Sequence, residues 1–253
     1  MGTRTGTYGA GRAVRDLLMP ARCPGCGEVL SEPSLCGACW RGTPWLSAPL
    51  CDRLGLPLPF EHDAGGVSLA AKADPPPYAR ARAVALHDGI ARRVVHALKY
   101  QDRQDLVPMM GLWMARAGAP LISDADVLVP VPLHWLRLMR RGFNQSDVLA
   151  GAVARRSGLP VAQGLKRTRR TRQQVRLSGA ARRRNVAGAF AVRDGARPAI
   201  AGRRVVLIDD VITTGATVHA CTRALLRAGA ASVDVLAFSR VPAETGPDEP
   251  LDA

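Results

Sequence analysis

The sequence predicts an α/β protein in which a parallel sheet with helices on both faces follows a small zinc-binding module. Two features indicate this: short apolar runs alternate with amphipathic helical stretches after residue 78, and four cysteines gather near the N-terminus. With 253 residues and 47% hydrophobic side chains, the chain is long enough for one sizeable core and a small accessory module.

The first module, residues 1–43, contains two Cys-x-x-Cys pairs, Cys23 with Cys26 and Cys36 with Cys39. Nine residues separate the pairs, a spacing that suits one tetrahedral zinc ion. Four thiolates leave no open coordination position, so we expect the Zn²⁺ to be structural. Disulfides are the alternative, which a reducing compartment disfavours.

Residues 44–78 are predicted to be an irregular connector, because prolines interrupt them repeatedly. The main domain, residues 79–242, follows. Its expected strands are 83–86, 127–131, 205–210 and 233–238, and its expected helices include 106–117 and 145–157. A further expected helix has Ile90, Val94, Val95 and Leu98 along one side and Arg92, Arg93 and Lys99 outside. The acidic tail, residues 243–253, is predicted to be disordered.

Residues 205–217 are the most informative stretch, because an apolar run ends in Asp209 and Asp210 and then in small hydroxyl residues. Parallel strands place ligands beyond their carboxyl ends, and a helix N-terminus favours phosphate. The predicted phosphate loop is Thr213, Thr214, Gly215, Ala216 and Thr217, and the apolar positions of the following helix are Val218, Cys221, Leu225 and Leu226. Carboxylates repel phosphate but accept hydrogen bonds from sugar diols, so the pattern favours a ribose 5-phosphate group. An ordinary turn with a Thr cap is the alternative.

This string resembles the phosphoribosyl pyrophosphate signature of type I phosphoribosyltransferases. Val-Pro-Val-Pro-Leu-His at 129–134, Arg-Arg-Gly-Phe-Asn-Gln at 140–145 and the cysteine-rich start narrow the resemblance to the ComF family of competence proteins, over most of residues 15–242. The resemblance implies that Asp209 and Asp210 are the ribose-binding, catalytic acids. It also implies that phosphoribosyl pyrophosphate binds with Mg²⁺, in nucleoside chemistry linked to DNA uptake.

The resemblance also bears on Cys51, which begins a Cys-x-x-Leu-Gly stretch. At this place the family carries a second zinc-binding turn, or knuckle, of the form Cys-x-x-Cys-Gly. Leu54 replaces the second cysteine, and Ser68 and Ala71 stand where a further pair would lie. We expect this second knuckle to be degenerate and Cys51 to be a small packed residue, as we expect for Cys221.

Arginines after the strand at 127–131 are candidates for binding pyrophosphate, because guanidinium forks match phosphate oxygens. They are Arg137, Arg140 and Arg141, and a solvated basic helix is the alternative. A further basic segment contains Arg169, Arg170 and Arg172, within a stretch from 148 to 193 that has twelve basic residues and no acid. It suits a lid over pyrophosphate, a groove for single-stranded DNA, or a solvated loop.

Composition excludes several classes of function. No apolar run reaches the roughly 20 residues needed to cross a bilayer, so membrane insertion is not expected and a cytoplasmic location follows. No Walker loop occurs, and of the five histidines only His219, expected to face solvent, lies near the predicted site. Three hypotheses remain: an enzyme that binds phosphoribosyl pyrophosphate, a non-catalytic module that acts with single-stranded DNA and competence or DNA-processing proteins, and a degenerate fold kept for protein contacts.

Overall fold

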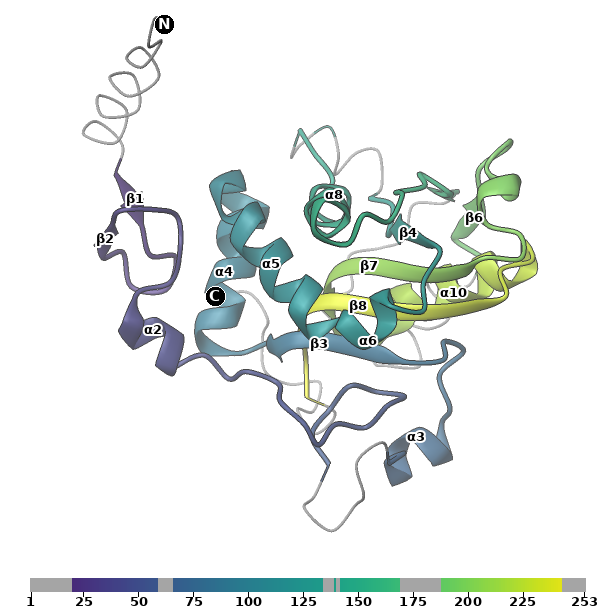
Figure 1. Cartoon of the computed structure of the whole chain (residues 1–253), viewed down its shortest axis with the longest axis horizontal. Coiled ribbons are helices and arrows are strands. Elements are labelled where there is room, and N and C mark those ends of the chain that lie inside the picture. Colours follow the sequence, from purple (N-terminus) through teal and green to yellow (C-terminus); the bar gives the residue numbers. More distant parts are fainter. Residues whose placement is uncertain (1–19, 59–65, 134–138, 140–141, 169–187, 243–253) are drawn as a thin grey trace, which may run out of the picture.

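The computed structural model describes residues 20–58, 66–133, 139, 142–168 and 188–242. At its centre lies a parallel sheet of four strands in the order β3-β8-β7-β4 (Figure 1). The strands are Ala81–Leu86 (β3), Val127–Pro130 (β4), Arg204–Ile212 (β7) and Ser232–Arg240 (β8). Two short antiparallel pairs are Ala21–Arg22 (β1) with Val29–Leu30 (β2), and Leu165–Arg167 (β5) with Phe190–Val192 (β6). The predicted parallel sheet is confirmed.

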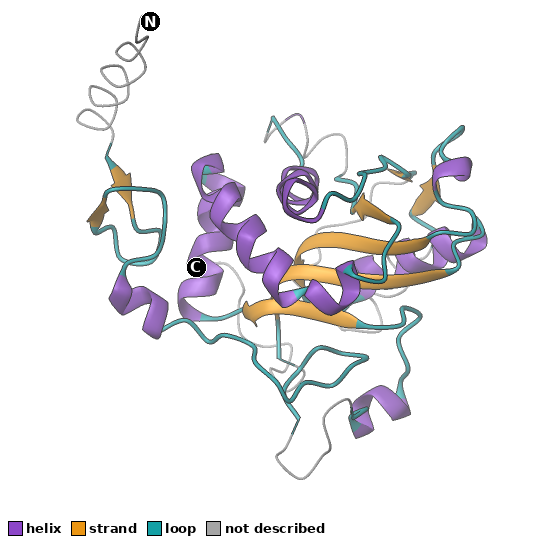
Figure 2. Cartoon of the chain, in the orientation of Figure 1, coloured by secondary structure: helices purple, strands orange, loops and turns teal. Residues whose placement is uncertain are grey.

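Helices cover both faces of this sheet, as predicted (Figure 2). The α-helices are Gly37–Arg41 (α2), Leu69–Ala73 (α3), Gly89–Tyr100 (α4), Val107–Ala117 (α5), Ala119–Ile122 (α6), Gln145–Ser157 (α8) and Ala216–Arg227 (α10), with 3₁₀ turns at Gln104–Leu106 and Arg197–Ala199. Val206 and Ile208 pack with α4, α5 and α8, whereas Val205 and Leu207 pack with α10. Alternate residues of β7 therefore belong to two cores, which explains its continuous apolar run.

Strand β7, Arg204–Ile212, is longer than the predicted strand 205–210. Strand β4 pairs with β7 only as far as Pro130 opposite Ile208, but β8 continues to Arg240 opposite Ile212. The hydrogen bonds to β8 therefore keep Asp209 and Asp210 inside the strand, rather than in the loop after it. Both acids lie just past the point where β4 stops pairing with β7.

Helix α10 follows the predicted phosphate loop, as expected, but one of its apolar residues is exposed. Val218, Cys221 and Leu225 are buried, whereas Leu226 is 38% exposed. The first three residues are spaced by three or four positions and share one side of the helix, and Leu226 lies a further 100° around it.

The N-terminal module and the sheet form one packed body. Leu86 donates its backbone N–H to the carbonyl of Pro44 at 2.9 Å, and Leu46 donates to Val84 at 3.0 Å, so residues 44–46 run along the outer edge of β3. Cys36 and Cys39 share a hydrophobic core with residues of α4, α5 and β8. This connection covers an edge strand that would otherwise be open to pairing with other chains.

Among the described residues, no helix is both long enough and apolar enough to span a lipid bilayer.

Candidate functional site

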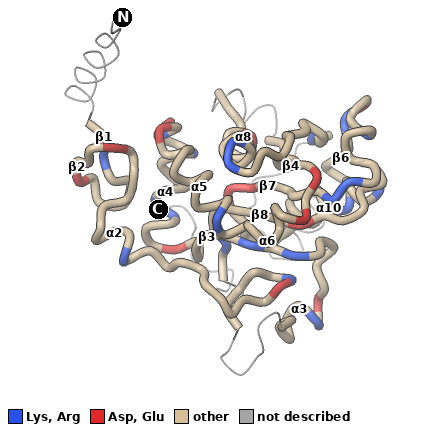
Figure 3. The backbone as a smooth tube through the Cα atoms, in the orientation of Figure 1, with Lys and Arg blue, Asp and Glu red and all other residues tan. Residues whose placement is uncertain are grey.

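Asp209 and Asp210 lie side by side near the carboxyl end of β7, each only 8% exposed. They form the red stretch of β7 in Figure 3. Asp209 accepts hydrogen bonds at Oδ1 from the hydroxyl of Ser146 at 3.1 Å and from the backbone N–H of Asp210 at 2.9 Å. Ser146 lies in the first turn of α8. The Arg-Arg-Gly-Phe-Asn-Gln stretch used in the sequence analysis ends at residue 145, so Ser146 was not identified as a site residue.

Burial, and next the adjacent charge of Asp210, raise the pKa of Asp209 to about 7, against the opposing effects of Lys99 and of the two hydrogen-bond donors. A carboxyl with this pKa is poised to exchange a proton near neutral pH. Such a shift, caused by burial and a like charge together, is typical of functional sites.

Lys99 is a site residue that the sequence analysis placed wrongly on the outside of its helix. Its Nζ atom lies 3.1 Å from Oδ1 of Asp210, and its side chain is only 22% exposed. Lys99 is four residues after Val95 and so lies at the margin of the buried stripe of α4, which is the signal that could have identified it.

His87 is a second missed residue at the same edge of the sheet. It follows β3 directly, and its Nδ1 atom lies 2.8 Å from the hydroxyl of Ser239 at the end of β8. Burial and the charge of Lys99 lower the pKa of His87 to about 4, so its ring is neutral at pH 7. His87 therefore lies near the acid pair, whereas the sequence analysis had placed only His219 near the site.

The predicted phosphate loop forms a turn between β7 and α10. Thr214 is exposed, Thr213 and Thr217 are half-buried, and Gly215 and Ala216 are buried, so the turn reaches solvent through its threonines. Gly215 caps the helix with a φ of +76°, and a Cβ atom there would also lie 2.9 Å from the His219 ring. Glycine is thus needed for both conformation and space. His219 is half-buried against Tyr78, with 5.6 Å between the ring centroids. The prediction that His219 faces solvent was therefore wrong.

The segment after β4 leads from the sheet into α8. Asn144 precedes α8, and its side-chain amide donates to the carbonyl of Val131 at 3.0 Å, which ties the two ends of this segment together. The predicted pyrophosphate-binding residues Arg137, Arg140 and Arg141 lie outside the described residues, as do Arg169, Arg170 and Arg172 of the basic segment.

The four predicted zinc ligands come together in the structure. The Sγ atoms of Cys23, Cys26, Cys36 and Cys39 all lie within 4.8 Å of one another. Two thiolates on one tetrahedral zinc, each at about 2.3 Å, are separated by about 3.8 Å. The Sγ atoms of Cys26 and Cys36 are 3.6 Å apart, so the cluster fits a single zinc ion with no ligand position left over.

The segment around Cys51 repeats the hydrogen bonds of the segment that carries the four zinc ligands, which we call the zinc ribbon. Cys23 donates its N–H to Glu28 at 2.8 Å and its Sγ accepts from the N–H of Cys36 at 3.4 Å. Cys51 likewise donates to Leu56 at 2.8 Å and its Sγ accepts from the N–H of Ser68 at 3.3 Å.

The two short helices complete this repeat. Cys36 caps α2 by accepting from the N–H of Cys39, and Ser68 caps α3 by accepting from the N–H of Ala71. Ser68 and Ala71 therefore occupy the positions of two zinc ligands, and Cys51 packs with Leu58 and Ala71 in an apolar cluster. The connector is more regular than we expected, because it includes α3 and this second, ligand-poor ribbon.

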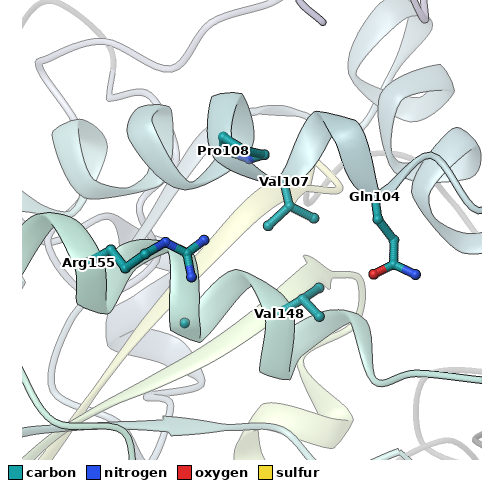
Figure 4. A pocket seen from close by; sticks show the side chains of 6 residues that line it. Gln104, Val107, Pro108, Val148 and Arg155 are labelled. Atoms are coloured by element: carbon teal, nitrogen blue, oxygen red, sulfur yellow. The ribbon is translucent and has the colours of Figure 1, made fainter. Parts of the chain in front are cut away.

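A shallow cleft of about 290 Å³ lies between α5 and α8 (Figure 4). Its lining residues are Gln104, Val107, Pro108, Val148, Gly151 and Arg155. The α8 residues that line it point away from the side of the helix that carries Ser146, because they are offset by about half a turn. The cleft is therefore separate from the acid pair.

The ligand geometry predicts about one zinc ion per chain. Cys39→Ser should lose the metal and lower the free energy of unfolding, because a structural zinc site contributes folding energy. Cys51→Ser is the matched control, a buried cysteine in the equivalent ribbon, and should keep the metal. Elemental analysis of the purified variants checks both. A second zinc ion, or loss of zinc in Cys51→Ser, would contradict this interpretation.

Asp209 should make the stability of the protein depend on pH. Its pKa is about 7 when folded and about 4 in an unfolded chain, so between these values the folded state binds more protons. The free energy of unfolding should therefore fall as pH rises from about 4 to about 7. Asp209→Asn should remove this part of the decline in urea unfolding.

The control for this pH dependence is Asp126→Asn at the opposite end of β7. Hydrogen bonding to the Arg204 amide holds the pKa of Asp126 below its usual value, so Asp126 stabilises the fold above that range and the stabilisation is lost only in more acidic solution. An Asp209→Asn variant that declines as steeply as the wild type would show that Asp209 is not the group responsible.

Comparison with known proteins places these features in a family. Residues 14–70 match the Double zinc ribbon domain and residues 144–252 match the Phosphoribosyl transferase domain. A solved structure of "the allosteric regulatory enzyme of purine biosynthesis" is similar over 56% of this chain and 30% of its own, with 25% identity and a TM-score of 0.40.

Similarity in sequence extends over most of the chain. This chain is 34% identical to "DNA utilization protein YhgH" of Escherichia coli K12 over 219 residues, and the alignment covers 84% of this chain and 92% of that protein. It is also 35% identical to "Competence protein ComFC" of Bacillus subtilis over 163 residues, an alignment that covers 63% of each chain. With "Competence protein F" of Haemophilus influenzae it shares 35% identity over 116 residues, which cover 46% of this chain and 50% of that protein. The chain therefore belongs to the ComF/YhgH family, with an N-terminal zinc ribbon and a phosphoribosyltransferase domain.

Proposed function

We propose that this protein binds phosphoribosyl pyrophosphate with Mg²⁺ at the carboxyl end of β7, and that this binding serves the uptake or use of DNA. The observation that carries the proposal is the position of Asp209 and Asp210, past the end of the pairing with β4 and three residues before an open turn that begins α10. A cytoplasmic location, in which thiols stay reduced, suits both the ribbon and the ligand.

The acid pair supplies acceptors for a sugar. Ribose carries two neighbouring hydroxyls, each of which can donate a hydrogen bond to a carboxylate oxygen. Ionised Asp209 and Asp210 can accept both, and a charged carboxylate forms stronger hydrogen bonds than a neutral one. Their oxygens also suit Mg²⁺, which prefers oxygen ligands and binds phosphates of its substrates. The metal would neutralise charge on the pyrophosphate.

The turn after β7 suits the 5-phosphate of the same ligand. Helix α10 has twelve residues, so its first backbone N–H groups form an anion-binding end. Thr213, Thr214 and Thr217 add hydroxyl donors, and Gly215 lets the backbone approach the phosphate closely. Arg137, Arg140 and Arg141 are the proposed partners of the pyrophosphate.

Transfer chemistry at such a site would break the bond between the anomeric carbon and pyrophosphate, while an acceptor forms a new bond to that carbon. Positive charge develops on the sugar as pyrophosphate leaves, and the buried carboxylates would stabilise it. Asp210 is the nearest candidate for a base that takes the acceptor's proton. The fold itself does not imply turnover, so a screen for pyrophosphate release with bases and amines tests this step.

Binding is tested by titration calorimetry with phosphoribosyl pyrophosphate in the presence of Mg²⁺. The double variant Asp209→Asn, Asp210→Asn should abolish measurable binding, because the amides keep the shape but lose both charges. Asp126→Asn, at the other end of β7, is the control and should bind like the wild type. Wild-type affinity in the double variant would refute the proposal.

Single-stranded DNA is a second candidate ligand, favoured by the names of the relatives and by the basic segment that contains Arg169, Arg170 and Arg172. The backbone of a DNA strand would be neutralised by these arginines, with release of counterions. The basic segment contains no aromatic residue from 166 to 184, so binding would depend on charge rather than on base stacking.

Salt dependence tests this second candidate. The logarithm of the affinity for single-stranded DNA should fall with the logarithm of salt concentration by roughly 0.7 for each phosphate neutralised. Charge reversal at Arg169, Arg170 and Arg172 should flatten that slope in anisotropy titrations. The control is charge reversal at three exposed arginines elsewhere, Arg203, Arg223 and Arg227. An affinity that does not change with salt would exclude this mode of binding.

A further inference from the structure

Lys99 is the cationic side chain that contacts the acid pair in the described part of the chain. Its ammonium lies 3.1 Å from Asp210, with side-chain exposures of 22% for Lys99 and 12% for Asp210. Both charges are therefore largely withdrawn from water, a position in which removal of one partner leaves the other poorly compensated. Lys99 is also one of only three lysines in a chain with 35 basic residues, and a lysine supplies a compact charge rather than a planar fork.

Lys99 lies on the face of the sheet where pyrophosphate is expected. Helix α4 packs against the same core as α5 and α8, whereas α10, which begins at the proposed 5-phosphate turn, packs on the opposite face. The segment after β4, tied by Asn144 to Val131, leads into α8 on the face of Lys99. Lys99 thus lies on the face of the sheet opposite α10, so the proposed pyrophosphate end of the ligand, rather than its 5-phosphate end, is expected on the side of Lys99.

The zinc ribbon holds α4 in this position. A Cβ atom on Gly25 would lie 2.6 Å from Sγ of Cys39 and 3.3 Å from Ile90, and one on Gly42 would lie 3.2 Å from Ile90, so the ribbon backbone touches the first turn of α4 directly. Beyond the other end of α4, Arg103 donates to the carbonyl of Arg22 at 2.9 Å. With both ends anchored, the Lys99 backbone has little room to withdraw when Asp210 changes partner.

We propose that Lys99 contacts the pyrophosphate group of bound phosphoribosyl pyrophosphate and is held by Asp210 until that ligand arrives. This inference rests on the proposed function. When ribose hydroxyls and Mg²⁺ engage the acids, the Lys99 ammonium exchanges its carboxylate partner for a pyrophosphate oxygen. The ion pair thus keeps a phosphate-binding cation in place while the site is empty, so that little rearrangement is needed on binding.

The test compares two probes that represent the two ends of the ligand, inorganic pyrophosphate and ribose 5-phosphate, each titrated at saturating Mg²⁺ alongside phosphoribosyl pyrophosphate. Lys99→Met keeps much of the aliphatic stem and removes the charge. It should weaken binding of pyrophosphate and of phosphoribosyl pyrophosphate about tenfold or more, the size expected for loss of a charged hydrogen bond. Ribose 5-phosphate should bind with unchanged or higher affinity, because Asp210 no longer has to leave Lys99.

Two further variants separate charge from structure. Lys99→Arg retains a positive charge and should keep most of the affinity for pyrophosphate. Lys72→Gln removes the charge of an exposed lysine on α3 and should bind like the wild type. Thermal unfolding without ligand shows whether each variant is folded. If Lys99→Met is not folded, the pyrophosphate affinity of Lys99→Arg is compared with that of the wild type instead.

Each outcome decides a different point. Undiminished pyrophosphate affinity in Lys99→Met would overturn the proposal and leave Lys99 as a neutraliser of Asp210. Equal loss of ribose 5-phosphate and pyrophosphate affinity would also overturn it, because Lys99 would then merely maintain the shape of the acid pair. Wild-type protein that binds none of the three probes would refute the proposed function itself, together with this inference.

Discussion

The site is constrained by the need to hold two carboxylates on consecutive residues of one strand, each largely buried. Two such charges repel one another and are poorly solvated, so each needs its own partner. Asp209 has a hydroxyl and an N–H donor, and Asp210 has an ammonium. Helix α8 supplies the first partner and α4 the second, so the acid pair depends on the positions of both helices.

The zinc ribbon gains a mechanical role from this arrangement. It packs against α4 through Ile90 and shares the core of the main domain, rather than hanging from it on a flexible linker. The second ribbon keeps the same hydrogen bonds with an apolar cluster in place of a metal. One lobe thus has four thiols that fit a zinc ion, and the other has apolar side chains in the equivalent place.

Local patterns in the sequence were enough to predict the fold class, the four zinc ligands and the four longer helices of the main domain, α4, α5, α8 and α10. Cys-x-x-Cys spacing and helical periodicity depend on nearby residues, and so they survive without knowledge of the fold. The partners of the acids could not be predicted in this way. Lys99 is 111 positions from Asp210 and Ser146 is 63 from Asp209, and only the order of the strands brings them together. The extension of β7 beyond Asp210, to Ile212, was missed for the same reason, because it depends on pairing with β8.

The most direct test of this interpretation is a crystal structure of the protein with Mg²⁺ and phosphoribosyl pyrophosphate. We expect the ribose hydroxyls within hydrogen-bonding distance of Asp209 and Asp210, the 5-phosphate at Thr213 to Thr217, and the Lys99 ammonium on a pyrophosphate oxygen. A ligand bound elsewhere on the molecule, with the ion pair between Lys99 and Asp210 intact, would contradict it.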